Sequence, residues 1–526
     1  MKTNSCAQSK NDQAGNGCRW PVVWLGCAVP LIQSRHVKRS GRISHRVRLS
    51  ACLLLFFAII RVYSAVSETF QIEVIDPNPA LLSSDGKVIA ADTAEAVDRL
   101  SGDHPLRIGV AADDATQLVL RVRASNAVTF SVSPGFGTLR DLSEGSNAVR
   151  SLTVAPRNAS DGTGWAFALY TPPDALPGTA ARPSLTISVR EGSRAGSVSL
   201  RLESPPVLLV HGLWSDYSTW NGLKDFLAHR GFRICEEPSC IVNYGPTQPA
   251  PPFDPLAQEL EDQFAINHLI AATTNALNSI RQEGIAATQV DVVAHSLGGL
   301  IARARVALPD SARAYRRREN FQRGDFHKLI TIGTPHRGTA VADFLVANRG
   351  VRSFLFGGAT LEEYLAGLGY PLGPAVEQMQ TFSPALVNLG ATTDVPSHAV
   401  VGIALASSRT ERMLNSLPGA LGSLYTVDDL LGGNGRHDTL VPRHSQTGGL
   451  PRTAVTLARA VVHAELDARD VGETDARFIW RRVAQLLRAP SHSKWFAEFT
   501  ALETNAAMIP NIDTQSARFY FPAANN

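Results

Sequence analysis

The feature that most restricts the possible folds of this chain is a segment in its middle, Asp291–Leu300, which reads DVVAHSLGGL. An apolar run leads to His295, and Ser296 is followed by Leu297 and two glycines. Such a run is typical of a buried strand, and glycines allow a backbone to turn tightly and to pack closely. We therefore predict a strand, a strained turn at Ser296 and a helix, with the Ser296 hydroxyl exposed where the strand ends.

A second buried strand is predicted upstream, in Pro205–Trp214, which reads PPVLLVHGLW. Its apolar part ends in a His-Gly pair, and the helical segment between this strand and Ser296 gives enough chain for a parallel crossover. If Ser296 is a nucleophile, backbone amides beside these two turns are suited to hold an oxyanion, and Leu213 and Leu297 are the positions that fit. The alternative is that the His-Gly pair merely ends a strand.

Two residues further along the chain complete the set that a nucleophilic serine needs. Asp438 lies in the turn Gly435–Pro442, which reads GRHDTLVP, and His463 follows the strand-like run Ala454–Val462. A histidine beside a serine can take its proton, and an acid beside that histidine fixes the tautomer and stabilises the imidazolium. We predict Ser296 as nucleophile, His463 as base and Asp438 as orienting acid, in the chain order Ser, Asp, His.

Other histidines and acids are weaker alternatives for these roles. His398 precedes a strand-like run rather than following one, while His437 and His444 lie close to the predicted acid and are interpreted as loop residues. His336 and Asp343 are possible metal ligands without ordered spacing, so no metal site is predicted. Three further acids combine a short turn with a downstream histidine less well than Asp438 does: Asp394, Asp428 and Asp429.

Four motifs, taken in order, resemble the bacterial lipase-like branch of the α/β-hydrolases, including the group related to GPI-inositol deacylases. They are HGLW at residues 211–214, AHSLGG at 294–299, TIGTPHRG at 331–338 and HDTLVP at 437–442. The usual nucleophile motif has Gly where this chain has Ala294, which is also small. The resemblance covers about residues 205–490.

This resemblance implies an α/β-hydrolase fold, in which a mostly parallel sheet is flanked by helices. It also implies hydrolysis of carboxylic esters, as by a lipase or carboxylesterase, through an acyl-enzyme on Ser296 and without an organic cofactor. The expected substrate is an apolar ester or lipid. Because this fold hosts many chemistries, two alternatives remain: an acyltransferase with the same three residues, and a cell-surface binding protein with a degenerate catalytic domain.

The first 66 residues predict export. Ten of the 50 Lys and Arg residues fall within residues 1–65, together with one of the 47 Asp and Glu residues. An apolar run over residues 51–60 and small residues up to Ala65 follow, as in a secretory signal. The run is shorter than the ~20 residues of a membrane span. We predict a cleaved signal peptide or, alternatively, an uncleaved membrane anchor, and a secreted, periplasmic or cell-surface protein.

The charge of the chain is concentrated in this leader. The remaining residues include 40 basic and 46 acidic side chains, so the formal net charge of +3 does not describe them. No basic stripe with interleaved aromatic residues follows the leader. Nucleic acid is therefore not a predicted partner.

Cysteine usage fits an oxidising compartment. Four of the six cysteines lie in the leader, and the other two, Cys235 and Cys240, bracket a short loop. Their spacing suits neither a redox motif nor a zinc site. We predict a local disulfide between them, with a stabilising effect of about 2–3 kcal/mol.

The patterning of the chain changes near residue 204. Residues 67–203 predict an all-β sandwich of immunoglobulin-like type, and residues 204–490 alternate strands with helices and predict the α/β domain. Residues 339–395 are apolar and broken by glycines, which predicts either a mobile cap over the site or a buried helical hairpin. Residues 491–526 form a C-terminal tail. The predicted strands of the sandwich are residues 70–75, 118–123, 127–132, 184–189 and 197–202.

Overall fold

A computed structural model describes residues 70–143, 145–178, 182–257, 259, 263–309, 314–390, 395–405, 408–420, 426–432 and 436–491. All of these fall within one compact unit of the chain, Glu68–Asn526. The predicted leader over residues 1–66 and the tail after Ser491 lie outside the described residues. No helix in the described ranges is both long and apolar enough to cross a membrane.

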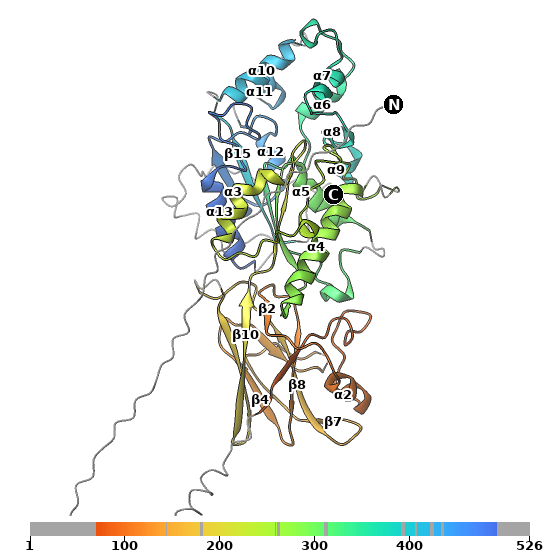
Figure 1. The fold of residues 1–526 in the computed structure, drawn as a ribbon, viewed down its shortest axis with the longest axis vertical. Coiled ribbons are helices and arrows are strands. Elements are labelled where there is room, and N and C mark those ends of the chain that lie inside the picture. Colours follow the sequence, from red (N-terminus) through yellow and green to blue (C-terminus); the bar gives the residue numbers. More distant parts are fainter. Residues whose placement is uncertain are drawn as a thin grey trace, which may run out of the picture. The chain divides into compact units, whose positions relative to one another are not determined.

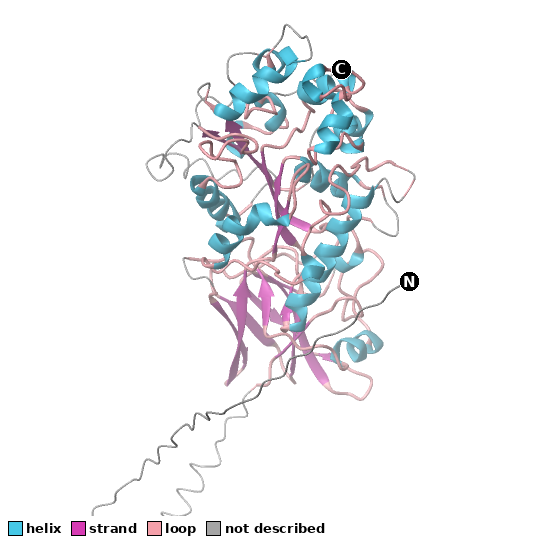
Figure 2. Ribbon diagram, turned by 45° about the horizontal axis from the view of Figure 1, so that its top comes forward, coloured by secondary structure: helices cyan, strands magenta, loops and turns pink. Residues whose placement is uncertain are grey.

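A five-stranded sheet forms the centre of the second half of the chain (Figure 2). All neighbouring strands are parallel, and nearly every residue in them is buried. Burial on both faces requires a continuous run of mainly apolar residues rather than an alternating pattern, and these segments have such runs. The strands, in spatial order, are β11 (Val207–Val210), β13 (Val290–His295), β14 (Phe326–Ile332), β15 (Ser397–Ile403) and β16 (Val455–Arg459).

Helices cover both faces of this sheet (Figure 1). α3 (Asn221–Ala228) and α13 (Arg477–Arg488) pack on one face, and α4 (Phe264–Gln282) and α5 (Leu297–Ala307) on the other. After β11 the chain passes through α3 to a short parallel bridge beside Val210, and it then returns through α4 to β13 on the opposite side of β11. Such a reversal opens a crevice at the carboxyl ends of the strands.

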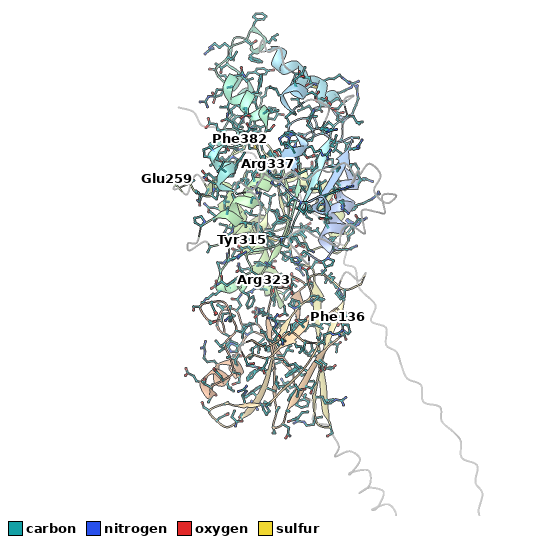
Figure 3. The ribbon with its side chains drawn as sticks, turned by 180° about the vertical axis from the view of Figure 1, so that it is seen from behind. Phe136, Glu259, Tyr315, Arg323, Arg337 and Phe382 are labelled. Carbon is teal, nitrogen blue, oxygen red and sulfur yellow. A yellow bond between two sulfur atoms is a disulfide. The ribbon has the colours of Figure 1, made fainter. Side chains whose placement is uncertain are left out.

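The segment over residues 339–395 is a helical layer with exposed apolar tips. Leu345, Leu361 and Val376 join the core that lies under α4 and α5. By contrast, Phe354 is 96% exposed and Phe382 is 91% exposed. Figure 3 labels the Phe382 side chain. The buried part agrees with a packed hairpin, and the mobile cap stays a prediction. The helices of this segment are α6 (Ala340–Asn348), α7 (Leu361–Gly367), α8 (Pro374–Gln378) and α9 (Pro384–Asn388).

The N-terminal part of the described chain forms two β-sheets around one apolar core. Exposed and buried residues alternate along β9, as expected for a sheet with one face on a core. The immunoglobulin-like type stays a prediction. The first sheet contains β1 (Glu73–Ile75), β3 (Leu118–Arg123), β8 (Gly164–Thr171), β5 (Thr138–Arg140) and β7 (Arg157–Asn158). The second has the order β12 (Ile285–Ala286), β2 (Gly109–Ala111), β10 (Arg194–Glu203), β9 (Ser184–Glu191), β4 (Val128–Val132) and β6 (Ser151–Val154).

One strand of the second sheet comes from beyond residue 204. β12 follows α4, and its residue Ile285 pairs in parallel with Gly109 of β2. A side chain at Gly109 would have no room, because its Cβ would lie 2.5 Å from Ile285 Cδ1. Ala286 joins the apolar core between the N-terminal sheets. The two predicted domains therefore share a sheet, and the boundary between residues 203 and 204 stays a prediction.

A buried imidazole connects the same two regions. Nδ1 of His327, on β14, lies 2.8 Å from Asp291 Oδ1, and its Nε2 lies 2.8 Å from Asp174 Oδ1. Asp174 follows β8 of the N-terminal sheets and also accepts a hydrogen bond from the Ser491 amide. Burial and the neighbouring Lys328 disfavour a positive charge on His327, but the two carboxylates outweigh them and raise its pKa. Both ring nitrogens face acceptors, so both donate and His327 is an imidazolium.

We expect the free energy of unfolding to depend on this imidazolium. A histidine whose pKa is raised on folding contributes stability that is complete below its unfolded pKa of about 6.5 and is lost as the pH rises through the folded pKa. His327→Gln should lower the free energy of unfolding by about 3–5 kcal/mol at pH 6, and by less as the pH rises. Urea unfolding across a pH series measures this, with the exposed His229→Gln as control. A difference from wild type that is constant with pH would contradict the imidazolium.

Candidate active site

Ser296 lies in the turn between β13 and α5. Its backbone has φ 53° and ψ −127°, a conformation that is costly for an L-residue and that the surrounding structure must impose. Its amide donates to Ile332 O on the neighbouring strand, at 2.9 Å. The turn therefore holds the hydroxyl at the carboxyl end of the parallel sheet, where the reversal of strand order at β11 opens a crevice.

The two glycines after Ser296 are required by close packing. A Cβ at Gly298 would lie 2.5 Å from the Val210 carbonyl oxygen, and a Cβ at Gly299 would collide with the Thr334 side chain. The first turn of α5 thus packs directly on the end of β11 and on the loop after β14. Available space therefore explains the two glycines of the AHSLGG motif.

Hydrogen bonds join the three side chains predicted to act together. Nε2 of His463 lies 2.8 Å from Ser296 Oγ, and its Nδ1 lies 2.8 Å from Asp438 Oδ2. A carboxylate can only accept, so Nδ1 carries the ring hydrogen and Nε2 is free to accept the hydroxyl proton of Ser296. Asp438 is fully buried, and its other oxygen accepts from the amides of Leu440 at 2.9 Å and Val441 at 2.7 Å.

Loops at the carboxyl ends of β15 and β16 supply the acid and the imidazole. After β15 the chain passes through α10 (Arg409–Ala420) and α11 (Val427–Leu430), and Asp438 lies in the turn before α12 (Arg443–Gln446). His463 lies shortly after β16, and its amide donates to the Asp438 carbonyl oxygen at 2.6 Å. Because neighbouring parallel strands end at the same edge, these loops meet beside Ser296.

The alternative residues have other partners. Asp394 lies outside the described residues, and His444 lies on α12. The hydrogen-bond partners of the others are Thr456 for His398, His437 for Asp428, Thr426 for Asp429, Thr331 and Arg303 for His336, and Thr381 for Asp343. His336 and Asp343 thus do not converge on a shared ligand position.

Two clusters of described residues bring possible metal ligands within 4.8 Å of one another. One is His295, His463 and Glu473, beside Ser296, and the other is His437, Asp428 and Glu411. The hydrogen bonds of His437 argue against its use as a ligand. The Thr439 amide donates to Nδ1 at 3.1 Å, so Nε2 carries the ring hydrogen and donates it to Asp428 at 2.8 Å. A metal would need the lone pair of that nitrogen. The His437–Asp428 hydrogen bond instead helps to hold the turn that carries Asp438.

One buried acid beside this set escapes sequence analysis. Glu473 is fully buried, and its Oε2 lies 3.7 Å from Nδ1 of His463. It belongs to none of the four motifs. Its only signal in the sequence is an acid between Gly472 and Thr474 in the loop that leads from His463 to α13, and that pattern is too common to indicate a site.

The loop after β11 runs directly beside Ser296. A Cβ at Gly212 would lie 2.8 Å from Ser296 Cβ, so the loop can come this close only with glycine. The Tyr244 hydroxyl donates to the His211 carbonyl, and their ring centroids are 3.9 Å apart. Burial lowers the pKa of His211 to about 4, so its ring is neutral, and Nδ1 donates to Gly212 O at 3.0 Å. These contacts fix the backbone that leads to Leu213.

Among the described residues, the two predicted oxyanion amides donate to no other acceptor. Leu297 is the first residue of α5, where no preceding helical turn offers an acceptor. Within the described ranges, no hydrogen bond uses the Leu213 amide. Both amides are therefore available close to Ser296.

Trp214, the next residue, fastens this loop to the helical layer of residues 339–395. Its indole Nε1 donates to Pro371 O at 2.8 Å, and its ring lies edge-on to Tyr370 with centroids 5.4 Å apart. Its amide donates to Pro249 O at 2.9 Å. The position of the Leu213 amide thus depends on contacts made by the helical layer.

We expect Trp214→Phe to lower activity through loss of the indole hydrogen bond. One such bond is worth about 1 kcal/mol, so a loop that is less well held should lower kcat/KM for an ester about five-fold. Steady-state kinetics with a p-nitrophenyl ester provide the measurement. Trp165→Phe, on β8, is a control for the general effect of replacing a tryptophan. Equal losses in the two variants would show that the indole bond has no specific role.

A disulfide joins Cys235 and Cys240. The loop that it closes packs on α4, where Asn275 Nδ2 donates to Ser239 O at 2.6 Å. Cys240 is buried in the core that α4 and α5 share. These contacts favour a structural role for the disulfide.

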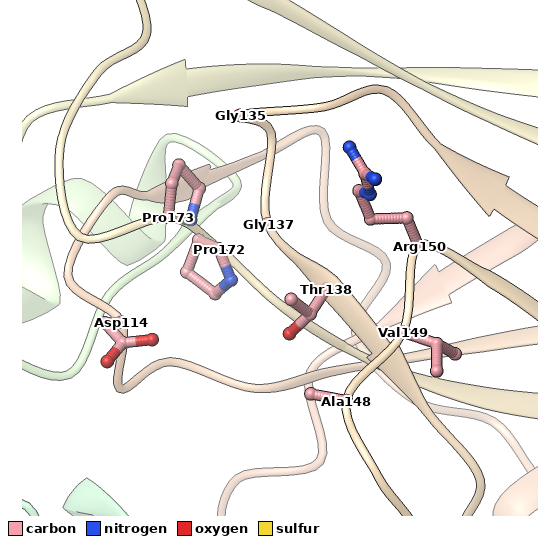
Figure 4. A pocket seen from close by; sticks show the side chains of 9 residues that line it. All are labelled: Asp114, Gly135, Gly137, Thr138, Ala148, Val149, Arg150, Pro172 and Pro173. Carbon is pink, nitrogen blue, oxygen red and sulfur yellow. The ribbon is translucent and has the colours of Figure 1, made fainter.

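A separate hollow lies on the N-terminal sheets (Figure 4). Its lining combines glycines and prolines with a few polar side chains, and none of the lining residues belongs to the elements around Ser296. The hollow therefore takes no part in the chemistry of that site. Its lining residues are Asp114, Gly135, Gly137, Thr138, Ala148, Val149, Arg150, Pro172 and Pro173.

Comparison with protein families finds a match in the middle of the chain. The family described as "Putative serine esterase (DUF676)" matches residues 267–355. This stretch runs from α4 through Ser296 and α5 into the segment after β14. The match confirms the resemblance to serine esterases that the motifs indicate. No curated protein matches the chain.

Several solved structures are also similar to the chain. Phospholipase PlaB from Legionella pneumophila is 12% identical, with a TM-score of 0.35, over 58% of this chain and 62% of PlaB. Lipase 1 from Pelosinus fermentans is 17% identical, with a TM-score of 0.33, over 54% of this chain and 98% of the lipase. A fungal esterase from Rhizomucor miehei is 13% identical, with a TM-score of 0.26, over 60% of this chain and 81% of the esterase. The chain thus spans less than two thirds of the length of PlaB.

Proposed function

We propose that this protein is an exported serine hydrolase that cleaves carboxylic esters with Ser296 as its nucleophile. The observation that carries the proposal is the continuous hydrogen-bonded set of Ser296, His463 and Asp438, with Ser296 on a strained turn at the carboxyl end of the sheet. A serine hydroxyl is a weak nucleophile unless an adjacent base removes its proton, and this set provides such a base.

In the first step, His463 Nε2 takes the hydroxyl proton while Ser296 Oγ forms a bond to the ester carbonyl carbon. The carbonyl oxygen becomes an oxyanion, and the amides of Leu213 and Leu297 donate hydrogen bonds to it. His463 then gives the proton to the alkoxide oxygen as the carbon–oxygen bond breaks, and an alcohol leaves. Asp438 stays ionised throughout and stabilises the imidazolium that forms.

In the second step, water attacks the acyl-enzyme with His463 as the base. The proton passes from water to His463 and then to Ser296 Oγ as the acid product leaves. An alcohol in place of water would give acyl transfer by the same residues. Activation of water by the same imidazole makes hydrolysis the outcome that we propose.

An apolar ester or lipid is the proposed substrate. Exposed apolar side chains on the helical layer support it: Phe354, Leu355 and Phe382 are all more than half exposed. Large apolar side chains facing water are costly unless they meet an apolar partner. The layer also contacts Trp214 beside the proposed oxyanion site.

Export rests on the basic leader with its apolar run and on the disulfide between Cys235 and Cys240. Disulfides persist in oxidising compartments and are rare in the cytosol. The proposed location is therefore outside the cytosol, at the cell surface, in a periplasm or in the medium.

Ser296→Ala should abolish ester hydrolysis. Loss of the nucleophile is expected to reduce kcat by about 10⁴–10⁶, without loss of the fold. The assay uses p-nitrophenyl esters of short and long acyl chains with protein that starts near Ser67, and the chain-length profile separates an esterase from a lipase. No hydrolysis by wild type, together with no labelling of Ser296 by a fluorophosphonate, would overturn the proposal.

Asp438→Asn should lower kcat by about 10⁴. An amide can donate to Nδ1 of His463, which favours the tautomer with its hydrogen on Nε2, and that nitrogen then cannot take the proton of Ser296. Asp428→Asn is a matched control, because Asp428 binds His437 in the neighbouring loop rather than His463. The comparison is made at saturating substrate. A similar loss in both variants would point to damage to the loops instead of the wrong tautomer.

A further inference from the structure

Glu473 faces the two imidazoles that flank Ser296. Its Oε2 lies 3.3 Å from His295 Nε2 and 3.7 Å from His463 Nδ1. His295 precedes Ser296 on β13, and the ring centroids of the two histidines are 4.8 Å apart. A single carboxyl group therefore lies against both the strand that carries the hydroxyl and the imidazole that binds it.

The fold leaves space for this carboxyl group at two strand ends. A Cβ at Gly333, directly after β14, would collide with Glu473 Oε2, and a Cβ at Gly402, in β15, would collide with Oε1. Gly333 also has φ 58°, a conformation that favours glycine. Two independent glycines thus make room for the same side chain, so the place of Glu473 is built into the sheet.

The charge state of Glu473 follows from its surroundings. Burial and the nearby Asp438 raise the pKa of Glu473 well above its usual range. Burial and the nearby His463 keep the pKa of His295 well below its usual range. At neutral pH Glu473 is therefore protonated and His295 is neutral. His295 Nε2 makes no hydrogen bond among the described atoms, so its 3.3 Å contact with Glu473 Oε2 leaves room for one. The nearby Asp438 carboxylate is the acceptor for the single hydroxyl proton of neutral Glu473.

We propose that Glu473 is a positioning residue that, in its neutral form, links His295 to the His463–Asp438 pair and so holds the His463 imidazole against Ser296 Oγ. This inference rests on the proposed function. A neutral donor fits this place better than an anion, because a second negative charge beside Asp438 would cost energy in a buried cluster. It would also favour the imidazolium form of His463, which cannot act as a base.

The test compares two substitutions with opposite expectations. Glu473→Gln keeps the shape, the neutral charge and a donor, so kcat and the acid limb of the pH–rate profile should match wild type. Glu473→Leu removes the donor and the link. This change also removes the buried hydrogen bond from Glu473 to the Asp438 carboxylate. We therefore expect kcat to fall about ten- to a hundred-fold while KM changes little. Asp114→Asn is the control, since it alters another carboxyl group with a raised pKa, in the N-terminal part of the chain and outside the elements around Ser296.

The kinetics of the two variants test both the neutral form of Glu473 and its positioning role. Equal losses in both Glu473 variants, with the acid limb of Glu473→Gln moved to lower pH, would show that the negative charge is needed and would overturn the neutral link. Wild-type kinetics in both variants would overturn any positioning role. If Glu473→Leu does not fold, the pH–rate profile of Glu473→Gln still decides, because an ionised Glu473 predicts a shifted acid limb and a neutral one does not.

A measurement without turnover separates this inference from the proposed function. Infrared difference spectra between wild type and Glu473→Gln should show the carbonyl stretch of a protonated carboxyl group at neutral pH. Its absence would overturn the neutral form even in an active enzyme. Lack of esterase activity and of fluorophosphonate labelling in wild type would instead overturn the proposed function, whatever the infrared result.

Discussion

The rest of the site depends on the strained backbone of Ser296. A positive φ at a residue with a side chain is unfavourable, and it persists here because β13 is held between β11 and β14 while α5 begins at the next residue. That packing in turn requires glycine at 212, 298 and 299, where a Cβ would meet neighbouring backbone or side-chain atoms. The glycines of the motifs are therefore needed first for the packing that imposes the turn at Ser296.

Burial determines where the protons lie around that turn. Two backbone amides and an imidazole donate to Asp438, whereas Glu473 has no comparable set of donors and its burial beside Asp438 raises its pKa. The two carboxyl groups are neighbours, and their different surroundings give them different affinities for a proton. His327 is the opposite case: two carboxylates surround a buried imidazole and keep it charged, and it supports the sheet from the far end of the strands.

The parts that sequence predicts well are those where one physical requirement fixes one residue type. Long apolar runs identify the strands β11, β13 and β16, and the small residues around Ser296 identify its turn. The acid and the imidazole follow from their order in the chain. Short or shared elements are harder: α2 (Ala94–Ser101), the two-residue β12 and its partner β2 depend on contacts between distant segments. Glu473 depends on space left by Gly333 and Gly402, and no local pattern reports such space. The exposed Phe354 and Phe382 show the same limit, because an apolar residue in sequence can face either a core or water.

The pairing of β12 with β2 has a consequence for folding during synthesis. The six-stranded sheet of the N-terminal region is not complete until Ile285 and Ala286 pair with β2, and those residues lie beyond the first strand of the parallel sheet. During translation, the backbone groups at this edge of β2 therefore stay unpaired until α4 and β12 have left the ribosome. The two halves of the protein mature together, and a nascent chain stalled before residue 285 would present an open sheet edge to chaperones or to other chains.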